Sequence, residues 1–522
     1  MKKTRLILGL SVVVFLILAY LNYRHLNIGF LSLYSIDEYA FHQSLLNMYD
    51  GLTNFNIGKL LSFNFYSYGF GFFILNTLAA APFIASGNVE MTIYIPRIIT
   101  SLFAVGSFWY LYQIARLYSN KYFSLLLSVV LLTMPAFWKN AMWFHPDWMM
   151  TFFIILSAYF FCKDEWNFKK YFWWSGVAFG LALGTKIQAI TFLPFVFMYV
   201  FYDNFKFRNF YNLKVKIKMF SKFLSLGMLT FLFSNPYLIH PAGLKLFIGS
   251  FVSNMKSNAT NHGLNVKVTL FEKIYNAIDF YYLNVFIFLL LFILSFYLIC
   301  LIFKKEDKKS IVNLVGFYFA INIFYLFLMV NKDWQHYYLT AFTFSPLFLL
   351  FFVNNFYKYK YHFIAVIILL QIGSHINEYK NVLTIGYHPE YEMTDTKQNE
   401  VSNSLIKDLE SVIKGNPNVL ISPFTPFDYS RLGLNYNNVN IIYGPISEEM
   451  FKSSDKSESK EIDLIILSKN DVYFKEEKLK SMVDVQEYKK AIEIIKNFNK
   501  GEKYGYEKFA EDKYFYIWKK IK

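Results

Sequence analysis

The chain has 522 residues, of which 55% are hydrophobic and 21% aromatic, and its formal net charge is +15. Its repeated long apolar runs exclude a soluble globular protein and predict an all-α polytopic membrane domain. The positive charge does not indicate nucleic-acid binding, because much of it lies in short loops between apolar runs, where membrane proteins keep cytoplasmic Lys and Arg. Cys162 and Cys300 both precede basic loops, so no disulfide framework or cysteine-based metal site is expected.

The N-terminus carries Lys2, Lys3 and Arg5 ahead of an apolar run that begins at Leu6. No small-residue cleavage site follows this run, so we expect a retained first span with a cytoplasmic N-terminus in a multi-pass protein of the cell membrane. In all we expect about 11 transmembrane helices. Their approximate positions are 6–22, 97–116, 122–138, 148–162, 171–184, 187–202, 223–239, 280–303, 311–330, 338–353 and 363–375.

The segment 69–86 is apolar enough to cross, yet a crossing there would move every later loop to the other side. The basic loops would then face outward, against the usual concentration of Lys and Arg inside. We therefore predict an interfacial or re-entrant helix within a long first outer loop, 23–96. The transmembrane domain is expected to cover 1–375.

The sequence changes after residue 375, where Lys, Glu, Asp and Asn become frequent and no long apolar run remains. Short apolar strands are expected to alternate with helices, which predicts a small α/β domain over 376–522, on the extracytoplasmic side. The expected strands are 418–421, 440–443, 463–467 and 514–518, and the expected helices are 399–414 and 484–499.

Polar side chains gather at the outer ends of the expected spans. Asp37 and Glu38 are the most informative, because adjacent carboxylates at a bilayer edge are costly unless they have a function. The full set is Asp37, Glu38, His145, Asp147, Lys186, Gln188, Asn235, Tyr237, His262, Lys332, Gln335 and His336, to which Arg97 adds a cation at a span boundary.

Each of these residues also has a structural explanation. Asp37, Glu38 and Asp147 can cap helices, and Lys186 can extend to the membrane interface. Arg97 can be an interface anchor, and His262 an ordinary loop residue. Their origin in separate parts of the chain nevertheless favours a shared site.

Carboxylates together with Lys, His and Gln at the outer surface suit transfer from a lipid-linked phosphate donor. A carboxylate can act as general base on an acceptor hydroxyl, and cations can stabilise the leaving phosphate. The lipid tail of the donor would lie between helices.

The chain resembles the GT-C superfamily of integral-membrane glycosyltransferases, and within it the protein O-mannosyltransferase-like group that uses polyprenyl-phosphate sugars. The resemblance covers about residues 1–375. It rests on Asp37-Glu38-Tyr39, the 97–116 span, Pro146-Asp147, Leu183-Gly184-Thr185-Lys186, Asn235-Pro236-Tyr237 and His336-Tyr337-Tyr338-Leu339.

The resemblance implies an inverting sugar transfer at the outer membrane face, with Asp37 as the general base and Asp147 as a second acid, alongside Glu38. It also implies that Lys186 and His336 contact the donor phosphate. Gln335, Arg97, Tyr237 and His262 are further expected substrate-binding residues. No Arg directly follows Asp37-Glu38, in contrast to some sugar-lipid transferases.

Some members of this superfamily use a divalent metal ion and others need none. Asp37, Asp147 and His145 are the candidate ligands here. The acceptor is expected to be a protein, a glycolipid or a polysaccharide of the cell envelope, and the identity of the sugar stays open.

A membrane transporter or lipid flippase is the alternative function. Such proteins place charges near the bilayer midplane and often show paired halves, whereas the charges here lie at span ends. A scaffold that presents the C-terminal domain would leave the outer polar residues unexplained.

Overall fold

The computed structural model describes residues 5–24, 36–63, 65–207, 211–260, 268–303, 311–351, 358–380, 387–388, 393–413, 415–422, 425–427, 429–434, 438–442, 445–448, 462–476, 485–498 and 505–521. The chain forms two compact units. The first comprises 1–24, 44–263 and 267–384, and the second comprises 25–43, 264–266 and 385–522.

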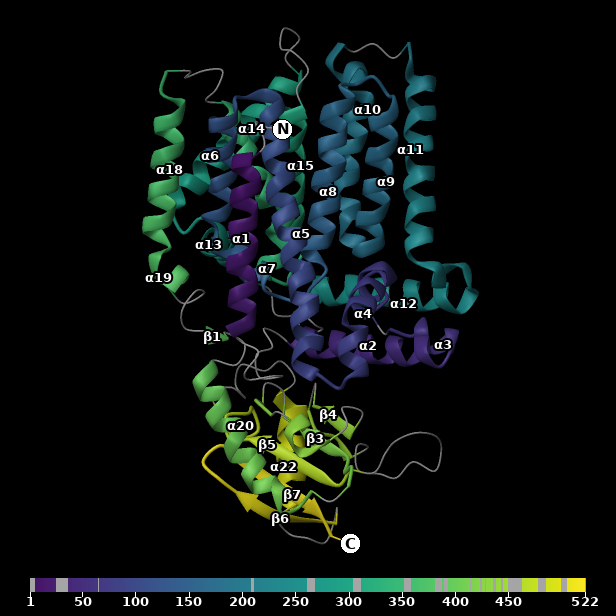
Figure 1. Ribbon diagram of the computed structural model, residues 1–522, viewed down its shortest axis with the longest axis vertical. Helices are drawn as coiled ribbons and strands as arrows, with labels where there is room; N and C mark the ends of the chain where they lie inside the picture. The colour runs from purple at the N-terminus through teal and green to yellow at the C-terminus, as the bar shows by residue number, and fades with distance from the viewer. Residues whose placement is uncertain are drawn as a thin grey trace. The chain divides into compact units, whose positions relative to one another are not determined.

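Helices build the first unit (Figure 1). The α-helices are α1 (Arg5–Arg24), α2 (Ile36–Thr53), α3 (Ile57–Leu60), α4 (Phe70–Ala85), α5 (Val89–Tyr118), α6 (Lys121–Leu132), α7 (Pro135–Ala141), α8 (Asp147–Asp164), α9 (Lys170–Thr185), α10 (Leu193–Phe207), α11 (Leu213–Ser234), α12 (Pro241–Thr260), α13 (Leu270–Tyr281), α14 (Val285–Phe303), α15 (Ile311–Met329), α16 (Leu339–Phe344), α18 (Lys360–Ser374) and α19 (Ile376–Lys380). Short 3₁₀ segments are η3 (Ile187–Phe192), η4 (Pro236–Ile239), η5 (Gln335–Tyr338) and η6 (Ser345–Leu350).

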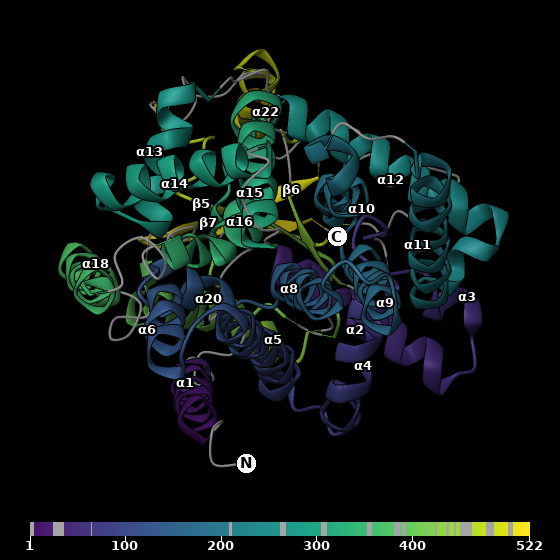
Figure 2. The same ribbon diagram turned by 90° about the horizontal axis from the view of Figure 1, so that it is seen from above.

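Long apolar helices of this unit run side by side, as Figures 1 and 2 show for α5, α8, α9 and α11. Among the described residues, five helices are long and apolar enough to cross a membrane: α1, α5, α11, α14 and α15. The bent pair α6–α7 would make six. The other helices at expected crossings are shorter or more polar. The helix α8, for example, contains Asp147, Lys163 and Asp164.

Three predicted spans differ from the structure in instructive ways. The 122–138 span is divided into α6 and α7, which meet at 70° near Pro135. The 187–202 span begins with the 3₁₀ turn η3 and becomes α-helical only at Leu193. The span predicted at 223–239 was wrong at both ends, because α11 starts at Leu213 and ends at Ser234. The first turns of α11 are rich in lysine, so the apolar run from which the span was predicted begins only after them.

The predicted first outer loop contains more helix than expected. The helix predicted over 69–86 is α4, while α2 and α3 were not predicted. Asn56 caps α3 and Asn88 caps α5, each by accepting a hydrogen bond from a first-turn backbone N–H. These caps mark where α3 and α5 begin.

Glycines allow α9 and α11 to pack closely. A methyl group on Gly180 would come within 2.5 Å of the Gly227 carbonyl oxygen, so the two helices touch backbone to backbone.

At the far end of α8, the buried Asp164 accepts hydrogen bonds from the backbone of Phe168 and Lys169 and from the Tyr199 hydroxyl. This carboxylate therefore fixes the turn between α8 and α9.

The C-terminal part of the second unit contains a five-stranded mixed sheet in the order β4-β3-β5-β7-β6. The strands are β3 (Val419–Ile421), β4 (Val439–Ile441), β5 (Leu464–Ser468), β6 (Tyr506–Glu511) and β7 (Phe515–Lys520), and a separate hairpin pairs β1 (Tyr387–His388) with β2 (Met393–Thr394). The helices are α20 (Asp395–Glu410) and α22 (Val485–Phe498), with the 3₁₀ turn η9 (Tyr429–Leu432).

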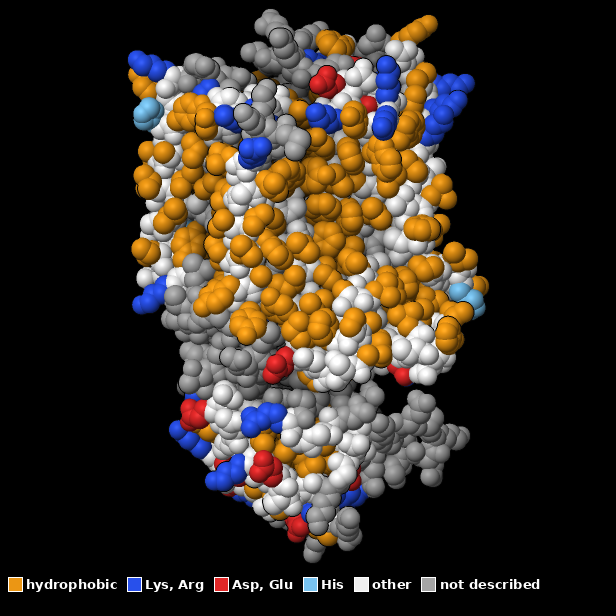
Figure 3. Space-filling view, in the orientation of Figure 1, with side chains coloured by type: hydrophobic (Ala, Val, Ile, Leu, Met, Phe, Trp, Pro, Cys, Tyr) orange, Lys and Arg blue, Asp and Glu red, His pale blue; other side chains and the backbone are white. Residues whose placement is uncertain are grey.

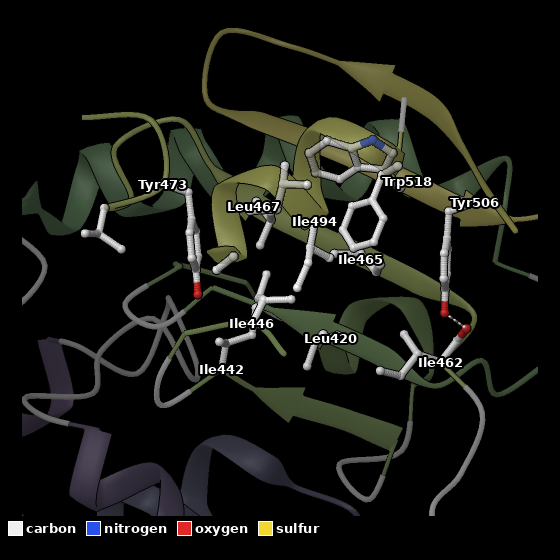
Figure 4. Close-up of a cluster of buried hydrophobic side chains, with 14 residues drawn as sticks. Leu420, Ile442, Ile446, Ile462, Ile465, Leu467, Tyr473, Ile494, Tyr506 and Trp518 are labelled. Atoms are coloured by element: carbon white, nitrogen blue, oxygen red, sulfur yellow. Dashed lines mark hydrogen bonds between the residues drawn. The ribbon is translucent and has the colours of Figure 1, made fainter. Parts of the chain in front are cut away.

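The core of this sheet is apolar, and Figure 4 shows its side chains converging between the strands and α22. Trp518 and Ile465 are almost fully buried there, and the Tyr506 hydroxyl donates to the Ile462 carbonyl at 2.8 Å. The four predicted strands and both predicted helices are present, whereas β6 and the short hairpin of β1 and β2 were missed. The small α/β domain in the predicted fold class is thereby confirmed.

Candidate functional site

A buried ion pair links the start of α8 to the end of α9. The Lys186 ammonium donates to Asp147 Oδ1 at 2.8 Å, and His145 Nδ1 contacts Asp147 Oδ2. All three residues are at most 5% exposed. Asp147 is the first residue of α8, where the positive end of the helix dipole favours a carboxylate.

The backbone around Lys186 is held by a close crossing of two chain segments. Lys186 leaves α9 in an extended conformation and pairs with Tyr68, while the Gly69 N–H donates to the Thr185 carbonyl at 2.8 Å. A methyl group on Gly69 would overlap the Gly184 carbonyl oxygen, at 1.4 Å. Only glycine fits here, and the crossing therefore fixes where the Lys186 side chain starts.

Asn235 supports the same crossing from the end of α11. Its side-chain oxygen accepts from the Phe70 N–H at 2.8 Å, and its side-chain amide donates to the Gly184 carbonyl at 3.3 Å. Tyr237, two residues later, is buried and donates from its hydroxyl to the Tyr66 carbonyl at 3.2 Å. Both residues stabilise the backbone next to Lys186, and substrate binding by Tyr237 stays a prediction.

Aromatic rings enclose the other side of the ion pair. The rings of Trp143 and His145 stack at 4.1 Å, and His336 lies 4.9 Å from His145 between ring centroids. The Lys186 ammonium lies over the rings of Tyr68 and Tyr337, at 5.2 and 5.4 Å from their centroids. These contacts keep a charged group stable in a nearly dry environment.

His336 is an uncharged neighbour of this charge pair. Burial lowers the pKa of His336 well below its usual range, and the nearby Lys186 charge acts in the same direction. Asp147 opposes this shift. We conclude that His336 can accept a hydrogen bond or donate to a metal ion but does not add a second positive charge.

Three of these residues have the composition of a metal site. His145, Asp147 and His336 each offer a donor atom, and these atoms lie within 4.8 Å of one another. Two imidazoles and one carboxylate suit Zn²⁺ and related divalent ions. Asp147 already neutralises Lys186. The residues present therefore fit a metal ion only if one carboxylate oxygen of Asp147 binds the metal while the other binds Lys186. Two of the three ligands predicted from the sequence, His145 and Asp147, are in this group, and His336 takes the third place in it instead of Asp37.

A cavity of about 200 Å³ opens beside the ion pair. Among the described residues that line the cavity, Lys186 is the one with a charged side chain. Asp147 and His145 do not line it, and Asp147 binds the Lys186 ammonium. The remaining lining residues are Ser67, Tyr68, Ile187, Gln188, Ile190, Thr191, Phe251, Asn254, Met255, Asn258, Tyr325, Leu326, Val330 and Tyr337. The cavity is therefore amphipathic, with a single cation.

The outer rim of the cavity is apolar. Ile190 from η3, Met255 from α12 and Tyr325 from α15 line the cavity and are also 48%, 57% and 41% exposed. At the inner end, Tyr337 donates from its hydroxyl to Asn258 Oδ1 at 3.3 Å and so joins the loop before α16 to α12. The space thus runs from a polar end at Lys186 to an exposed apolar opening.

Several predicted site residues are not among the described residues that line this cavity. Asp37 and Glu38 form the first turn of α2 in the second unit, with Glu38 buried and Asp37 partly buried. Arg97 is buried within α5 and Gln335 does not line the cavity. His262 lies outside the described residues.

Sequence reasoning missed three residues that define the site. Tyr68, Trp143 and Asn258 contact its charged or ring groups, but an aromatic or amide in such an aromatic-rich chain gives no local signal. The adjacent Tyr68-Gly69 pair was the only available hint, because the glycine marks a close backbone approach.

Known proteins resemble this chain in part of its sequence and in its fold. Residues 74–239 match a family model described as dolichyl-phosphate-mannose-protein mannosyltransferase. No curated protein sequence matches the chain.

Solved structures resemble the whole chain. ArnT from Cupriavidus metallidurans bound to undecaprenyl phosphate superposes with a TM-score of 0.63 at 9% identity, over 98% of this chain and 97% of that chain. Its apo state gives 0.58 at 10% identity over the same shares. The apo oligosaccharyltransferase of Archaeoglobus fulgidus gives 0.51 at 12% identity, over 87% of this chain and 69% of that chain.

At such identities, structural similarity shows the fold. The fold is that of the GT-C membrane glycosyltransferases, which confirms the predicted fold class. The family match over residues 74–239 agrees with the predicted resemblance to the protein O-mannosyltransferase-like group. The match gives no support to the transporter, flippase or scaffold alternatives.

Proposed function

We propose that this protein transfers a sugar from a polyprenyl-phosphate donor to an acceptor hydroxyl at the outer face of the cell membrane, with inversion and with Asp37 as general base. The observation that carries the proposal is the amphipathic cavity with Lys186 at its polar end. A donor of this class has one phosphate and one long apolar chain, which match the single cation and the apolar rim.

Lys186 is suited to the phosphate because its charge is fixed in place. Asp147 holds the ammonium at 2.8 Å, and the Tyr68 and Tyr337 rings flank it. A preorganised cation stabilises the charge that develops on a leaving phosphate without reorganising during the reaction. On this view, Asp147 acts through Lys186 as a positioning residue.

The lipid chain of the donor would leave through the rim formed by Ile190, Met255 and Tyr325. These side chains are apolar or aromatic and exposed, which suits contact with isoprenyl units in the bilayer. The similar ArnT structure was solved with undecaprenyl phosphate bound, which supports a donor of this class here.

The transfer step follows from these roles. The acceptor oxygen attacks the anomeric carbon as the bond from that carbon to the phosphate oxygen breaks. The acceptor proton passes to Asp37, and the polyprenyl phosphate departs with both bonding electrons, paired with Lys186. A direct attack of this kind inverts the anomeric centre and needs no carboxylate nucleophile, in contrast to retaining hydrolases.

A divalent metal ion is an optional component of this proposal. His145, Asp147 and His336 would hold it, and when bound it would supply further positive charge near the phosphate. We propose Glu38, Gln335, Arg97, Tyr237 and His262 as further substrate contacts from the sequence resemblance. The acceptor is a protein, a glycolipid or a polysaccharide.

The N-terminus is proposed to be cytoplasmic and the C-terminal domain extracytoplasmic.

Membranes that contain the protein, supplied with a polyprenyl-phosphate sugar labelled in the sugar, test the proposal. We expect label to enter an acceptor, and Lys186→Met to reduce transfer by about 100- to 1000-fold. Asp37→Asn should abolish transfer while donor binding persists. Lys245→Gln, on an exposed position of α12, is the matched control and should retain full transfer.

Two results would contradict the proposal. Normal transfer by Lys186→Met would remove the phosphate role, and normal transfer by Asp37→Asn would remove the base. Loss of lipid or solute transport without any change in glycan would favour a transporter instead.

A further inference from the structure

Three lysines of α11 form a stripe that the transferase site does not use. Lys214, Lys218 and Lys222 are four residues apart, and all three are exposed. At this spacing each lysine is displaced by only about 40° from the one before, so the stripe extends about 12 Å along one side of the helix.

The opposite side of α11 packs on the helical unit. Its buried residues are Phe223, Gly227 and Phe231, and Gly227 makes the close backbone contact with Gly180 of α9. Lys218 lies about 140° around the helix from Phe223. The lysine stripe therefore points away from the bundle.

None of the three lysines has a partner in the part of the chain that the structure describes. Lys216, between two of them, does have partners: it lies 3.9 Å from Asp203 and over the Phe168 ring at 4.2 Å. Its contacts tie the first turn of α11 to α10 and to the turn between α8 and α9. The stripe itself is left with three positive charges and no carboxylate.

The surroundings of the stripe belong to a lipid-facing surface. The helix α11 is one of the five apolar enough to cross a membrane, and Val215 and Ile217 are about half exposed beside the lysines. Tyr171 and Trp174 on neighbouring α9 are also exposed, as is typical of side chains at the headgroup level. Figure 3 shows Lys and Arg gathered at one end of the helical unit, above an apolar belt.

We propose that Lys214, Lys218 and Lys222 bind the head group of an anionic phospholipid of the surrounding leaflet, with its acyl chains along the apolar face of α11. Lysines that face hydrocarbon extend toward phosphates, and Lys222 lies deepest along the helix, where an unpaired ammonium is most costly. A phospholipid provides both the negative charge and the apolar chains that this surface requires. The site is independent of the proposed sugar transfer.

Native mass spectrometry of the purified full chain with phosphatidylglycerol or phosphatidylcholine tests this site. We expect wild type to retain phosphatidylglycerol preferentially. Each lysine should contribute about fivefold in affinity, so the K214Q/K218Q/K222Q variant should lose on the order of a hundredfold. The K214R/K218R/K222R variant should retain the lipid, because the charge is kept.

The matched control removes the same charge elsewhere. Lys489, Lys490 and Lys496 are exposed on α22 of the C-terminal unit, and K489Q/K490Q/K496Q should bind the lipid as wild type does. Equal retention of both lipids by wild type, or unchanged phosphatidylglycerol binding by K214Q/K218Q/K222Q, would overturn the site. Displacement of the lipid by inorganic phosphate would also overturn it, because the ligand would then be a soluble anion.

Discussion

The buried pair of Asp147 and Lys186 makes a quantitative prediction. Their charged atoms are 2.8 Å apart, and both residues are at most 5% exposed, so neither charge is solvated once its partner is removed. Breaking such a pair costs about 3–5 kcal/mol of stability, because it leaves a buried uncompensated charge. We therefore expect Asp147→Asn and Lys186→Met each to lose about that amount.

The double variant separates pairing from catalysis. With both charges removed, D147N/K186M leaves no uncompensated ion, and its loss of stability should be smaller than the sum of the two single losses by about 2–3 kcal/mol. Sugar transfer should remain absent in the double variant, because stability is recovered but the phosphate-binding cation is not.

Thermal unfolding in detergent, followed beside the labelled-sugar assay, measures both quantities on the same preparations. Additive losses of stability in the double variant would refute the ion-pair reasoning. Recovery of transfer in D147N/K186M would refute the role of Lys186 while leaving the pair intact as a structural element.

Three further predictions concern the scaffold. Burial lowers the pKa of His42 from 6.5 to about 4, so the unfolded chain takes up a proton below pH 6.5 before the folded one does. Stability should therefore fall by about 3 kcal/mol between pH 6.5 and 4, and chemical denaturation of His42→Gln should show a flatter profile. Gly180→Ala should lower the melting temperature through a loss of about 1–3 kcal/mol, whereas Gly249→Ala, with open space around it, should not. Asp164→Asn should lose about 1.5–3 kcal/mol in the same unfolding assay, because an amide cannot accept all three hydrogen bonds at this turn, and unchanged stability would contradict that role.

Local patterns in the sequence were sufficient where one element depends on its own residues. The strands Val419–Ile421 and Leu464–Ser468 are short apolar runs between turn residues, and they were predicted nearly to the residue. The strand β6 was missed because its residues alternate charge with aromatics and most of its side chains are exposed, so its pairing with β7 decides its conformation.

Element ends were harder to predict where polar residues continue a helix. The first turns of α11 contain Lys214, Lys216 and Lys218, so a search for apolar runs placed the start too late. The break between α6 and α7 depends on Pro135, which was visible, but its 70° angle depends on packing.

The sequence by itself determined that this is a membrane protein with a small α/β domain, and it identified Asp147, Lys186 and His336 as functional candidates. Apolar periodicity and isolated charges in apolar surroundings are local properties, so they can be read along the chain. Only the tertiary structure shows that Asp147 pairs with Lys186. It also shows that Tyr68 and Asn258 line the cavity and that Asn235 supports the backbone next to Lys186. These contacts join residues far apart in the chain, such as Phe70 and Asn235 at 165 positions, and depend on two glycines that let backbones touch, which no local pattern encodes.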